Sequence, residues 1–413
     1  MDYIINGGKK LCGEIAVYGA KNCALALLGA TPLTDEEIVL TNCPQIVDVD
    51  NMLALLAAMG KSVSRSGSTV RVSGAVDTTS VPSQFAGLLR GSGLLLGSLV
   101  SRYGQATLPV TGGCAIGSRP MDIHFDGLRR FGVDVNAEQN RVVCDGFPDG
   151  AKYSLRFASV GATENLVCAA ARGRGEFVLS NCALEPEVTA LCEMLEKMGA
   201  KIGGKNKSVK TICGVDRLHG TTFDVIPDRI VTCTYLAAGA ITCGDVRVTN
   251  CRPKSVSAFL RFLLRGGATI QTERTSVRVV AKKMRGYGRV MTAPYPFFPT
   301  DAQSLALSLA ACAKRGKTEI IETLFENRLA HNVGQLRKMG AKIRLYDNVA
   351  LVVGENLAGA KIVGNDLRGE AALIVAALAA YGQTVVKDIS HSCRGYIRLD
   401  SCLRSLGADI SQK

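Results

Sequence analysis

Residues 195–202 read LEKMGAKI, and residues 336–343 repeat that stretch almost letter for letter as LRKMGAKI. In both copies an apolar pattern of helical period ends at a glycine, and a strand-like run follows. A glycine directly after a helix readily adopts the left-handed conformation that closes the last turn, which strains most other residues. The stretch therefore predicts a helix, a left-handed cap and a strand, in that order.

Six copies of this pattern run along the chain, about 70 residues apart. The capping glycines are Gly60, Gly132, Gly199, Gly267, Gly340 and Gly407. Each copy has a helix rich in small residues, such as NLVCAAA in residues 165–171, then a β-branched strand, a second helix and a pair of strands. The sequence predicts an α/β protein built of six repeats.

The two ends of the chain look incomplete on their own. The last repeat stops one strand short at ADISQK, whereas the chain begins with the strand-like DYIINGG. We therefore expect the termini to complete one another. Three repeats per domain then give one domain of residues 20–225 and a second domain made of residues 1–19 and 226–413.

Composition restricts the class of protein. Hydrophobic residues make up 47% of the 413 residues and charged residues 21%, as in folded proteins with a large core. No apolar run is long enough to span a membrane, the start MDYIINGGKK carries no signal-like segment, and the 15 cysteines form no CxxC pair. We expect a cytoplasmic protein without a disulfide framework or a zinc site.

The formal net charge of +13 leaves several kinds of anionic partner open. Nucleic acid is disfavoured, because the chain has no Trp, 5% aromatic residues and no arginine-rich cluster. Small anionic substrates agree better than nucleic acid with the positions of the basic residues. The first helix of four repeats begins near a basic residue, where backbone N–H groups and the helix dipole also attract anions; these residues are Lys21, Arg90, Arg229 and Arg368.

One cysteine lies where packing does not explain it. The second repeat carries an insertion, the Gly-Gly before Cys114 in the stretch LPVTGGCAIGSRP. The corresponding loops of the fifth and sixth repeats carry Arg328 and Arg394. A lone arginine is most often a surface residue, and an Asp or Ser at a helix start is most often a cap, so position in the repeat leaves these roles open.

Nine ordered motifs together resemble the enolpyruvyl transferases, and among them the family of UDP-N-acetylglucosamine 1-carboxyvinyltransferases. The motifs are GAKNCALALLGATPLTDE, GGCAIGSRPMD, SVGATEN, EPE, IPDRI, FPTDAQ, ETLFENR, DLR and RGY. The resemblance covers nearly the whole chain. It implies two domains, each of three βαβαββ repeats packed as an inverse α/β barrel, that close around the substrates.

The resemblance also implies an activity. The enolpyruvyl group of phosphoenolpyruvate would pass to the 3′-hydroxyl of UDP-N-acetylglucosamine with release of phosphate, the first committed step of peptidoglycan synthesis. It implies no metal and no organic cofactor. We expect a monomer with these two small-molecule substrates and with neither a nucleic-acid nor a membrane partner.

Catalytic roles follow from the resemblance residue by residue. Cys114 matches the proton donor to the methylene carbon, on a loop whose glycines let it fold as a lid. Lys21, Arg119 and Arg394 match the groups that hold the phosphate and carboxylate of phosphoenolpyruvate. Asp301 matches the carboxylate that takes the proton from the attacking hydroxyl or orients that hydroxyl.

The resemblance assigns further positions to substrate binding and support. Asn22 would help to place phosphoenolpyruvate. The nucleotide sugar would contact Arg90, Arg119, Pro120, Met121, Asp122, Ile123, Ser159, Val160, Gly161 and Leu324. Residues for closure and support are Arg328, Asp366 and Arg368.

Three residues depart from the family pattern: Thr111, Cys233 and Glu370. Thr111 replaces a proline before the glycine pair, which would change the stiffness of the lid. A carboxylate at Glu370, beside the expected phosphate pocket, would oppose anion binding. These departures leave open an alternative, a catalytically weak or regulatory paralogue of the same fold that binds the UDP-sugar.

Overall fold

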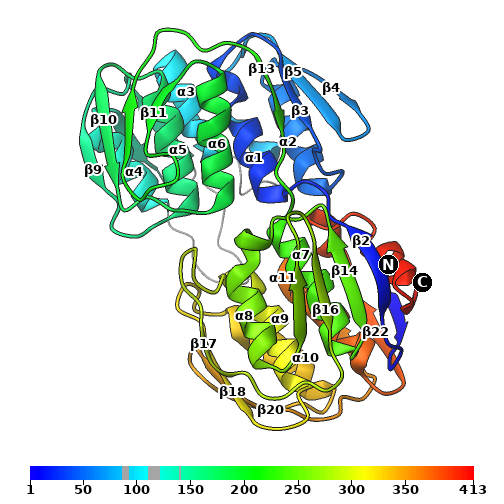
Figure 1. Ribbon diagram of the computed structural model, residues 1–413. Helices are drawn as coiled ribbons and strands as arrows, with labels where there is room; N and C mark the ends of the chain where they lie inside the picture. Colours follow the sequence, from blue (N-terminus) through cyan, green and yellow to red (C-terminus); the bar gives the residue numbers. More distant parts are fainter. Residues whose placement is uncertain (86–92, 110–120, 139–140) are drawn as a thin grey trace. The chain divides into compact units, whose positions relative to one another are not determined.

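The computed structural model describes residues 1–85, 93–109, 121–138 and 141–413 (Figure 1). The described residues form two compact units. Unit 1 comprises residues 1–18 and 227–413, and unit 2 comprises the described residues from 19 to 226. Whether these units coincide with the two domains expected from the repeats stays a prediction.

Three buried helices form the centre of unit 1, and three four-stranded sheets of the described residues pack around them. The central helices are α7 (Arg229–Ile241), α9 (Gln303–Ala311) and α11 (Leu367–Ala379), which pack against one another. Three further helices keep exposed residues: α8 (Ser257–Arg265), α10 (Arg328–Lys338) and α12 (Leu399–Ser405). The sheet orders are β15-β16-β14-β2, β17-β18-β20-β19 and β21-β22-β1-β23.

The strands of unit 1 are β1 (Tyr3–Asn6), β2 (Cys12–Ala16), β14 (Asp245–Thr249), β15 (Thr269–Thr272), β16 (Val277–Val280), β17 (Gly288–Met291), β18 (Lys317–Ile321), β19 (Lys342–Tyr346), β20 (Val349–Val353), β21 (Lys361–Val363), β22 (Gln383–Lys387) and β23 (Asp409–Gln412). Strand β1 lies between β22 and β23 and is antiparallel to both. The two ends of the chain therefore share one sheet.

Unit 2 follows the same plan. Its central helices are α1 (Lys21–Gly29), α3 (Leu95–Tyr103) and α5 (Val160–Ala171), and its other helices are α2 (Val47–Ala58), α4 (Asp122–Arg130) and α6 (Pro186–Lys197). Its strands are β3 (Ile38–Thr41), β4 (Ser62–Ser66), β5 (Thr69–Ser73), β6 (Gln105–Pro109), β7 (Asp134–Ala137), β8 (Arg141–Asp145), β9 (Lys152–Ser154), β10 (Glu176–Ser180), β11 (Lys201–Gly203), β12 (Lys210–Cys213) and β13 (Thr221–Asp224). They form the sheets β13-β3-β5-β4, β11-β12-β10-β9 and β6-β8-β7.

The third repeat shows the complete unit of sequence. It runs β9, α5, β10, α6, β11 and β12, with β9 parallel to β10 and β12 antiparallel to β10. A helical crossover is what joins parallel neighbours in such a sheet. The predicted α/β class and the βαβαββ order are confirmed.

The six predicted capping glycines all adopt the left-handed conformation, with φ from +81° to +105°. After α10, the N–H of Gly340 bonds to Arg337 O at 3.0 Å and the N–H of Ala341 bonds to Leu336 O at 3.0 Å. This pair of bonds is the Schellman motif, which satisfies carbonyls at the helix end. An added Cβ on Gly340 would meet nothing within 4 Å, so the backbone conformation and not crowding favours glycine there.

The chain passes from unit 1 to unit 2 after residue 18 and returns after residue 226. Before the first passage, β2 pairs in parallel with β14, more than two hundred residues later. Before the second passage, β13 pairs in parallel with β3 at the start of unit 2. Each unit is thus completed by a strand that is distant in sequence from its neighbour.

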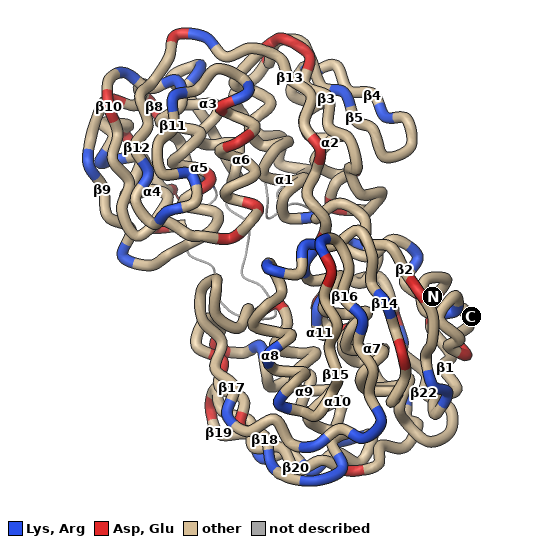
Figure 2. Tube along the Cα trace, viewed as in Figure 1, with Lys and Arg blue, Asp and Glu red and all other residues tan. Residues whose placement is uncertain are grey.

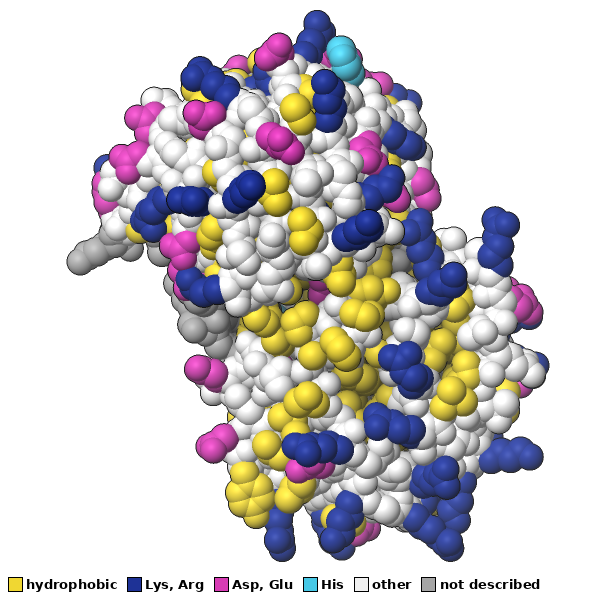
Figure 3. All heavy atoms as spheres, turned by 60° about the vertical axis from the view of Figure 1, so that its left-hand side comes forward, with side chains coloured by type: hydrophobic (Ala, Val, Ile, Leu, Met, Phe, Trp, Pro, Cys, Tyr) yellow, Lys and Arg dark blue, Asp and Glu magenta, His cyan; other side chains and the backbone are white. Residues whose placement is uncertain are grey.

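Lys and Arg occur on many separate elements of both units, interspersed with Asp and Glu (Figure 2). In the face drawn in Figure 3, basic side chains likewise stand among uncharged and acidic ones. Among the residues that the structure describes, no helix has both the length and the apolar composition needed to cross a membrane.

The central position of β1 in its sheet is testable with two neighbouring residues. Ile5 is fully buried, whereas Ile4 on the opposite face of the strand is partly exposed. We expect Ile5→Ala to lower the free energy of unfolding by about 2–5 kcal/mol, and Ile4→Ala by less than about 1 kcal/mol. Urea titrations followed by circular dichroism would measure both, and equal losses would contradict this packing of β1.

Candidate active site

Aspartates cap two of the central helices of unit 1. Asp228 accepts two backbone N–H groups of α7, the shorter bond at 2.7 Å, and Asp366 accepts two of α11, the shorter at 3.0 Å. Because each cap precedes the helix directly, Arg229 and Arg368 fall in the first turns. The predicted placement of basic residues at these N-termini is confirmed.

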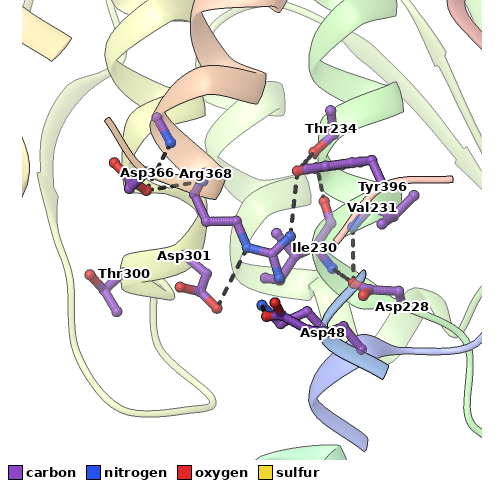
Figure 4. A network of polar contacts seen from close by, with 12 residues as sticks. Asp48, Asp228, Ile230, Val231, Thr234, Thr300, Asp301, Asp366, Arg368 and Tyr396 are labelled. Carbon is purple, nitrogen blue, oxygen red and sulfur yellow. Dashed lines mark hydrogen bonds and ion pairs between the residues drawn. The ribbon is translucent and has the colours of Figure 1, made fainter. Parts of the chain in front are cut away.

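Asp301 lies in a short 3-10 turn (Thr300–Ala302) that leads into α9. Its Oδ1 accepts a hydrogen bond from Arg328 Nη2 at 2.9 Å, and its Oδ2 lies 4.0 Å from Arg368 Nε. The side chains of Arg328 and Arg368 are only 2% and 5% exposed, whereas that of Asp301 is 25% exposed. Figure 4 shows the guanidinium of Arg368 pointing toward Asp301 and Tyr396.

These cations control the charge of Asp301. Burial alone would raise the pKa of Asp301, but the guanidinium groups of Arg328, Arg368 and Arg229 outweigh it and hold the pKa well below its ordinary value. Asp301 is therefore a carboxylate at neutral pH. A carboxylate of low pKa is a weak base and holds a proton only weakly. The geometry therefore favours a role in which Asp301 accepts a hydrogen bond from a hydroxyl and orients that hydroxyl.

Glu322 holds the turn of Asp301 and the loop of Leu324 together. It is buried, and its Oε1 accepts hydrogen bonds from the Leu324 N–H at 2.9 Å and from the Thr292 hydroxyl at 3.1 Å. Its Oε2 accepts from the Thr300 hydroxyl at 2.8 Å. We did not single out Glu322 from the sequence, although it opens the motif ETLFENR and that position could have indicated it.

Arg394 ends a second 3-10 turn (Ser392–Arg394), two residues before Tyr396. The hydroxyl of Tyr396 lies 2.9 Å from the hydroxyl of Thr234 and accepts a hydrogen bond from Arg368 Nη1 at 3.5 Å. Burial lowers the pKa of Arg368, but Tyr396, Asp301 and Asp228 outweigh it, so the pKa is raised above its ordinary value. Unit 1 thus brings the segment of Arg394 next to the cluster of Asp301, Arg328 and Arg368.

Lys21 of unit 2 begins α1, and Asn22 follows it. Lys21 Nζ forms an ion pair at 2.7 Å with Asp48 Oδ2 of α2, and the two side chains are 13% and 5% exposed. The sequence did not indicate Asp48, because the pair joins residues 27 positions apart. An anion that binds Lys21 must therefore compete with this carboxylate or share the ammonium group with it.

Six of the described positions for the nucleotide sugar lie where α4 and α5 of unit 2 begin, whereas Leu324 follows β18 in unit 1. Met121, Asp122 and Ile123 lie at the start of α4, and Ser159, Val160 and Gly161 at the start of α5. The Ser159 hydroxyl accepts from the Ala162 N–H at 3.3 Å, and Asp122 pairs with Arg156. The two helices pack on each other, and an added Cβ on Gly161 would lie 3.4 Å from the ring of His124.

Four predicted site residues and one departure lie outside the described residues: Arg90, Cys114, Arg119, Pro120 and Thr111. Of the other departures, Cys233 is a buried residue of α7, and Glu370 is buried in the first turn of α11. Within the described ranges, no group of three or more His, Cys, Asp or Glu side chains could hold a metal ion.

Comparison with solved structures defines the class of protein. The crystal structure of the enolpyruvyl transferase NikO from Streptomyces tendae is 26% identical, covers 99% of this chain and 98% of its own, and has a TM-score of 0.88. An EPSP synthase from Acinetobacter baumannii, 19% identical, covers both chains completely with a TM-score of 0.76, which shows the shared fold. The fold is that of the enolpyruvyl transferases.

Sequence comparison narrows the class to a family. The family model described as EPSP synthase (3-phosphoshikimate 1-carboxyvinyltransferase) matches residues 5–401. A UDP-N-acetylglucosamine 1-carboxyvinyltransferase of Zymomonas mobilis is 42% identical over 100% of this chain and 99% of its own, and one of Synechocystis is 40% identical over 99% and 94%. The chain belongs to the UDP-N-acetylglucosamine 1-carboxyvinyltransferase family of enolpyruvyl transferases.

The ion pairs of Asp301 predict a pH dependence of stability. Because the folded-state pKa is lowered, the contribution is fully present above the ordinary pKa of about 4 and is lost as the pH falls through the folded value. We expect Asp301→Asn to lower the free energy of unfolding by about 2–3 kcal/mol at pH 7, and the difference from the unsubstituted protein to shrink below about pH 4. Urea titrations of both proteins from pH 7 to pH 3 would measure it, and a constant difference would contradict the ion pairs.

Proposed function

We propose that this protein transfers the enolpyruvyl group of phosphoenolpyruvate to the 3′-hydroxyl of UDP-N-acetylglucosamine and releases phosphate. One observation carries the proposal: the Asp301 carboxylate is held ionised beside the buried guanidinium groups of Arg328 and Arg368. A negative side chain that orients a hydroxyl and fixed positive charges that attract a phosphorylated acid are what this reaction requires.

The proposed reaction is an addition followed by an elimination. Asp301 orients the sugar hydroxyl, whose oxygen attacks the second carbon of phosphoenolpyruvate and releases its proton by way of Asp301 to solvent, as the Cys114 thiol gives a proton to the methylene carbon. Lys21, Arg119 and Arg394 bind the phosphate and the carboxylate and stabilise the tetrahedral intermediate. Loss of a proton from the new methyl group and of phosphate from the central carbon then restores the double bond.

Binding of the nucleotide sugar is assigned mainly to the residues at the starts of α4 and α5. We propose that the nucleotide sugar contacts Arg90, Arg119, Pro120, Met121, Asp122, Ile123, Ser159, Val160, Gly161 and Leu324. Asn22 places phosphoenolpyruvate. Arg328, Asp366 and Arg368 support Asp301, which agrees with the burial of the two arginines and with the cap that Asp366 provides.

The proposed partners are these two substrates alone, for a monomer in the cytoplasm. Nucleic acid is not proposed as a partner, because basic residues are spread over many elements and not gathered in one stripe (Figure 2). A regulatory paralogue that binds the UDP-sugar without turnover is the weaker alternative, since Lys21, Cys114 and Asp301 are all retained.

Turnover is the first test of the proposal. We expect phosphate release to require both phosphoenolpyruvate and UDP-N-acetylglucosamine, and Asp301→Ala to lower kcat by at least about 100-fold, since the hydroxyl loses its orienting group. A coupled phosphate assay measures both proteins. A folded Asp301→Ala variant with a near-normal rate would refute the role of Asp301, and no turnover by the unsubstituted protein would favour the regulatory alternative.

The proposed role of Cys114 predicts covalent inhibition. Fosfomycin is an epoxide that resembles phosphoenolpyruvate, and a thiolate opens its ring by forming a carbon–sulfur bond. We expect one adduct per chain when UDP-N-acetylglucosamine is present, detected by intact mass and located by peptide mapping. Cys114→Ser is the control because 14 other cysteines remain; an adduct in that variant would contradict the assignment.

A further inference from the structure

Glu370 is a buried carboxylate that the proposed reaction does not use. It lies in the first turn of α11 and has no exposed surface. Its Oε1 accepts a hydrogen bond from the backbone N–H of Ser392 at 2.8 Å. Glu370 therefore joins a central helix to the turn that carries Arg394.

The bond from Glu370 holds the entry of that turn. Ser392 O in turn accepts the N–H groups of Gly395 at 3.1 Å and Tyr396 at 2.8 Å. The N–H of Arg394 bonds to His391 O at 3.1 Å. The N–H of Ser392 thus bonds to Glu370, and its carbonyl oxygen bonds to the residues that follow Arg394. A shift of Ser392 would therefore move the backbone of Arg394.

The exit of the turn is held separately. The hydroxyl of Tyr18 donates to Gly395 O at 3.3 Å and accepts the N–H of Ile397 at 3.0 Å. An added Cβ on Gly395 would lie 2.7 Å from the side chain of Leu367, so the turn rests directly on α11. Arg394 thus lies between two anchors, one of which is the Glu370 carboxyl group.

We propose that Glu370 is a positioning residue that fixes the backbone of Arg394 and thereby the affinity for phosphoenolpyruvate. The inference rests on the proposed function, because it takes Arg394 as a ligand of that substrate. The expected conflict between the Glu370 carboxylate and a bound anion is reduced, since burial raises the pKa of Glu370 to about 7 while hydrogen bonds from Ser392 and His391 oppose the rise.

A set of variants separates positioning from general destabilisation. Glu370→Ala removes the hydrogen-bond acceptor, and Glu370→Asp shortens the side chain so that the carboxylate lies farther from Ser392. Glu370→Gln keeps a carbonyl oxygen on a side chain of the same length. Thr318→Ala is the matched control, because the buried Thr318 hydroxyl likewise accepts a backbone N–H, that of Tyr287 at 3.0 Å, elsewhere in unit 1.

Steady-state phosphate release, with each substrate varied in turn, tests the proposal. We expect Glu370→Ala to raise KM for phosphoenolpyruvate about tenfold and Glu370→Asp about threefold, with KM for UDP-N-acetylglucosamine changed less than about twofold. Glu370→Gln and Thr318→Ala should leave both KM values within about twofold. If Glu370→Ala does not fold, the aspartate and glutamine variants test the positioning role on their own.

Three results would overturn the inference: unchanged KM values in Glu370→Asp, an equal rise of both KM values, or a glutamine variant as impaired as the aspartate variant. The unsubstituted protein distinguishes a different failure. If it releases no phosphate, the proposed function itself is wrong and the positioning role falls with it. If it turns over normally while the variants show no selective change, only the role of Glu370 is wrong.

Discussion

The central helices of unit 1 are buried around their whole circumference, and this constraint decides where chemistry can take place. Beyond their first turns, α7, α9 and α11 carry no charged residue, because a charge there would be desolvated without compensation. Only the helix ends offer unpaired backbone groups and access to solvent. The N-termini supply N–H donors and a positive dipole end, so capping carboxylates and guanidinium groups collect there. Asp228, Asp301 and Asp366 all lie at these ends.

The charged side chains at these helix ends depend on one another for their burial and their ionisation. Arg328 and Arg368 are almost fully buried, and burial of a guanidinium is unfavourable unless a carboxylate lies close by. Asp301 supplies that carboxylate, and its own ionisation depends on the same cations. Glu322 adds a second layer, because it binds the hydroxyl of Thr300, which also accepts a hydrogen bond from Arg328. Removing any one member therefore changes both the charge and the position of the others.

The local features of this arrangement can be predicted from the sequence, whereas the contacts between residues distant in sequence cannot. The capping glycines, the order of elements and the basic residues at helix starts were predictable, because each depends on residues a few positions apart. The ion pair of Lys21 with Asp48 and the contact of Tyr396 with Thr234 join residues 27 and 162 positions apart. One sequence without related sequences carries no signal for such pairs. Glu370 could be recognised as unusual, but its partner, the N–H of Ser392, follows only from the packing of the turn on α11.

Arg394 differs from the other cations of unit 1 in the element that carries it. Arg328 and Arg368 lie in the first turns of α10 and α11, whose backbone bonds fix their direction. Arg394 lies in a turn of three residues, which cannot hold its own geometry and depends on outside contacts. One of these contacts, Tyr18, comes from the amino-terminal segment that also contributes β1 to the sheet of β22 and β23. Tyr18 follows β2, which pairs with β14. The amino-terminal segment therefore also helps to hold a proposed substrate-binding residue, because the Tyr18 hydroxyl bonds to the backbone that follows Arg394.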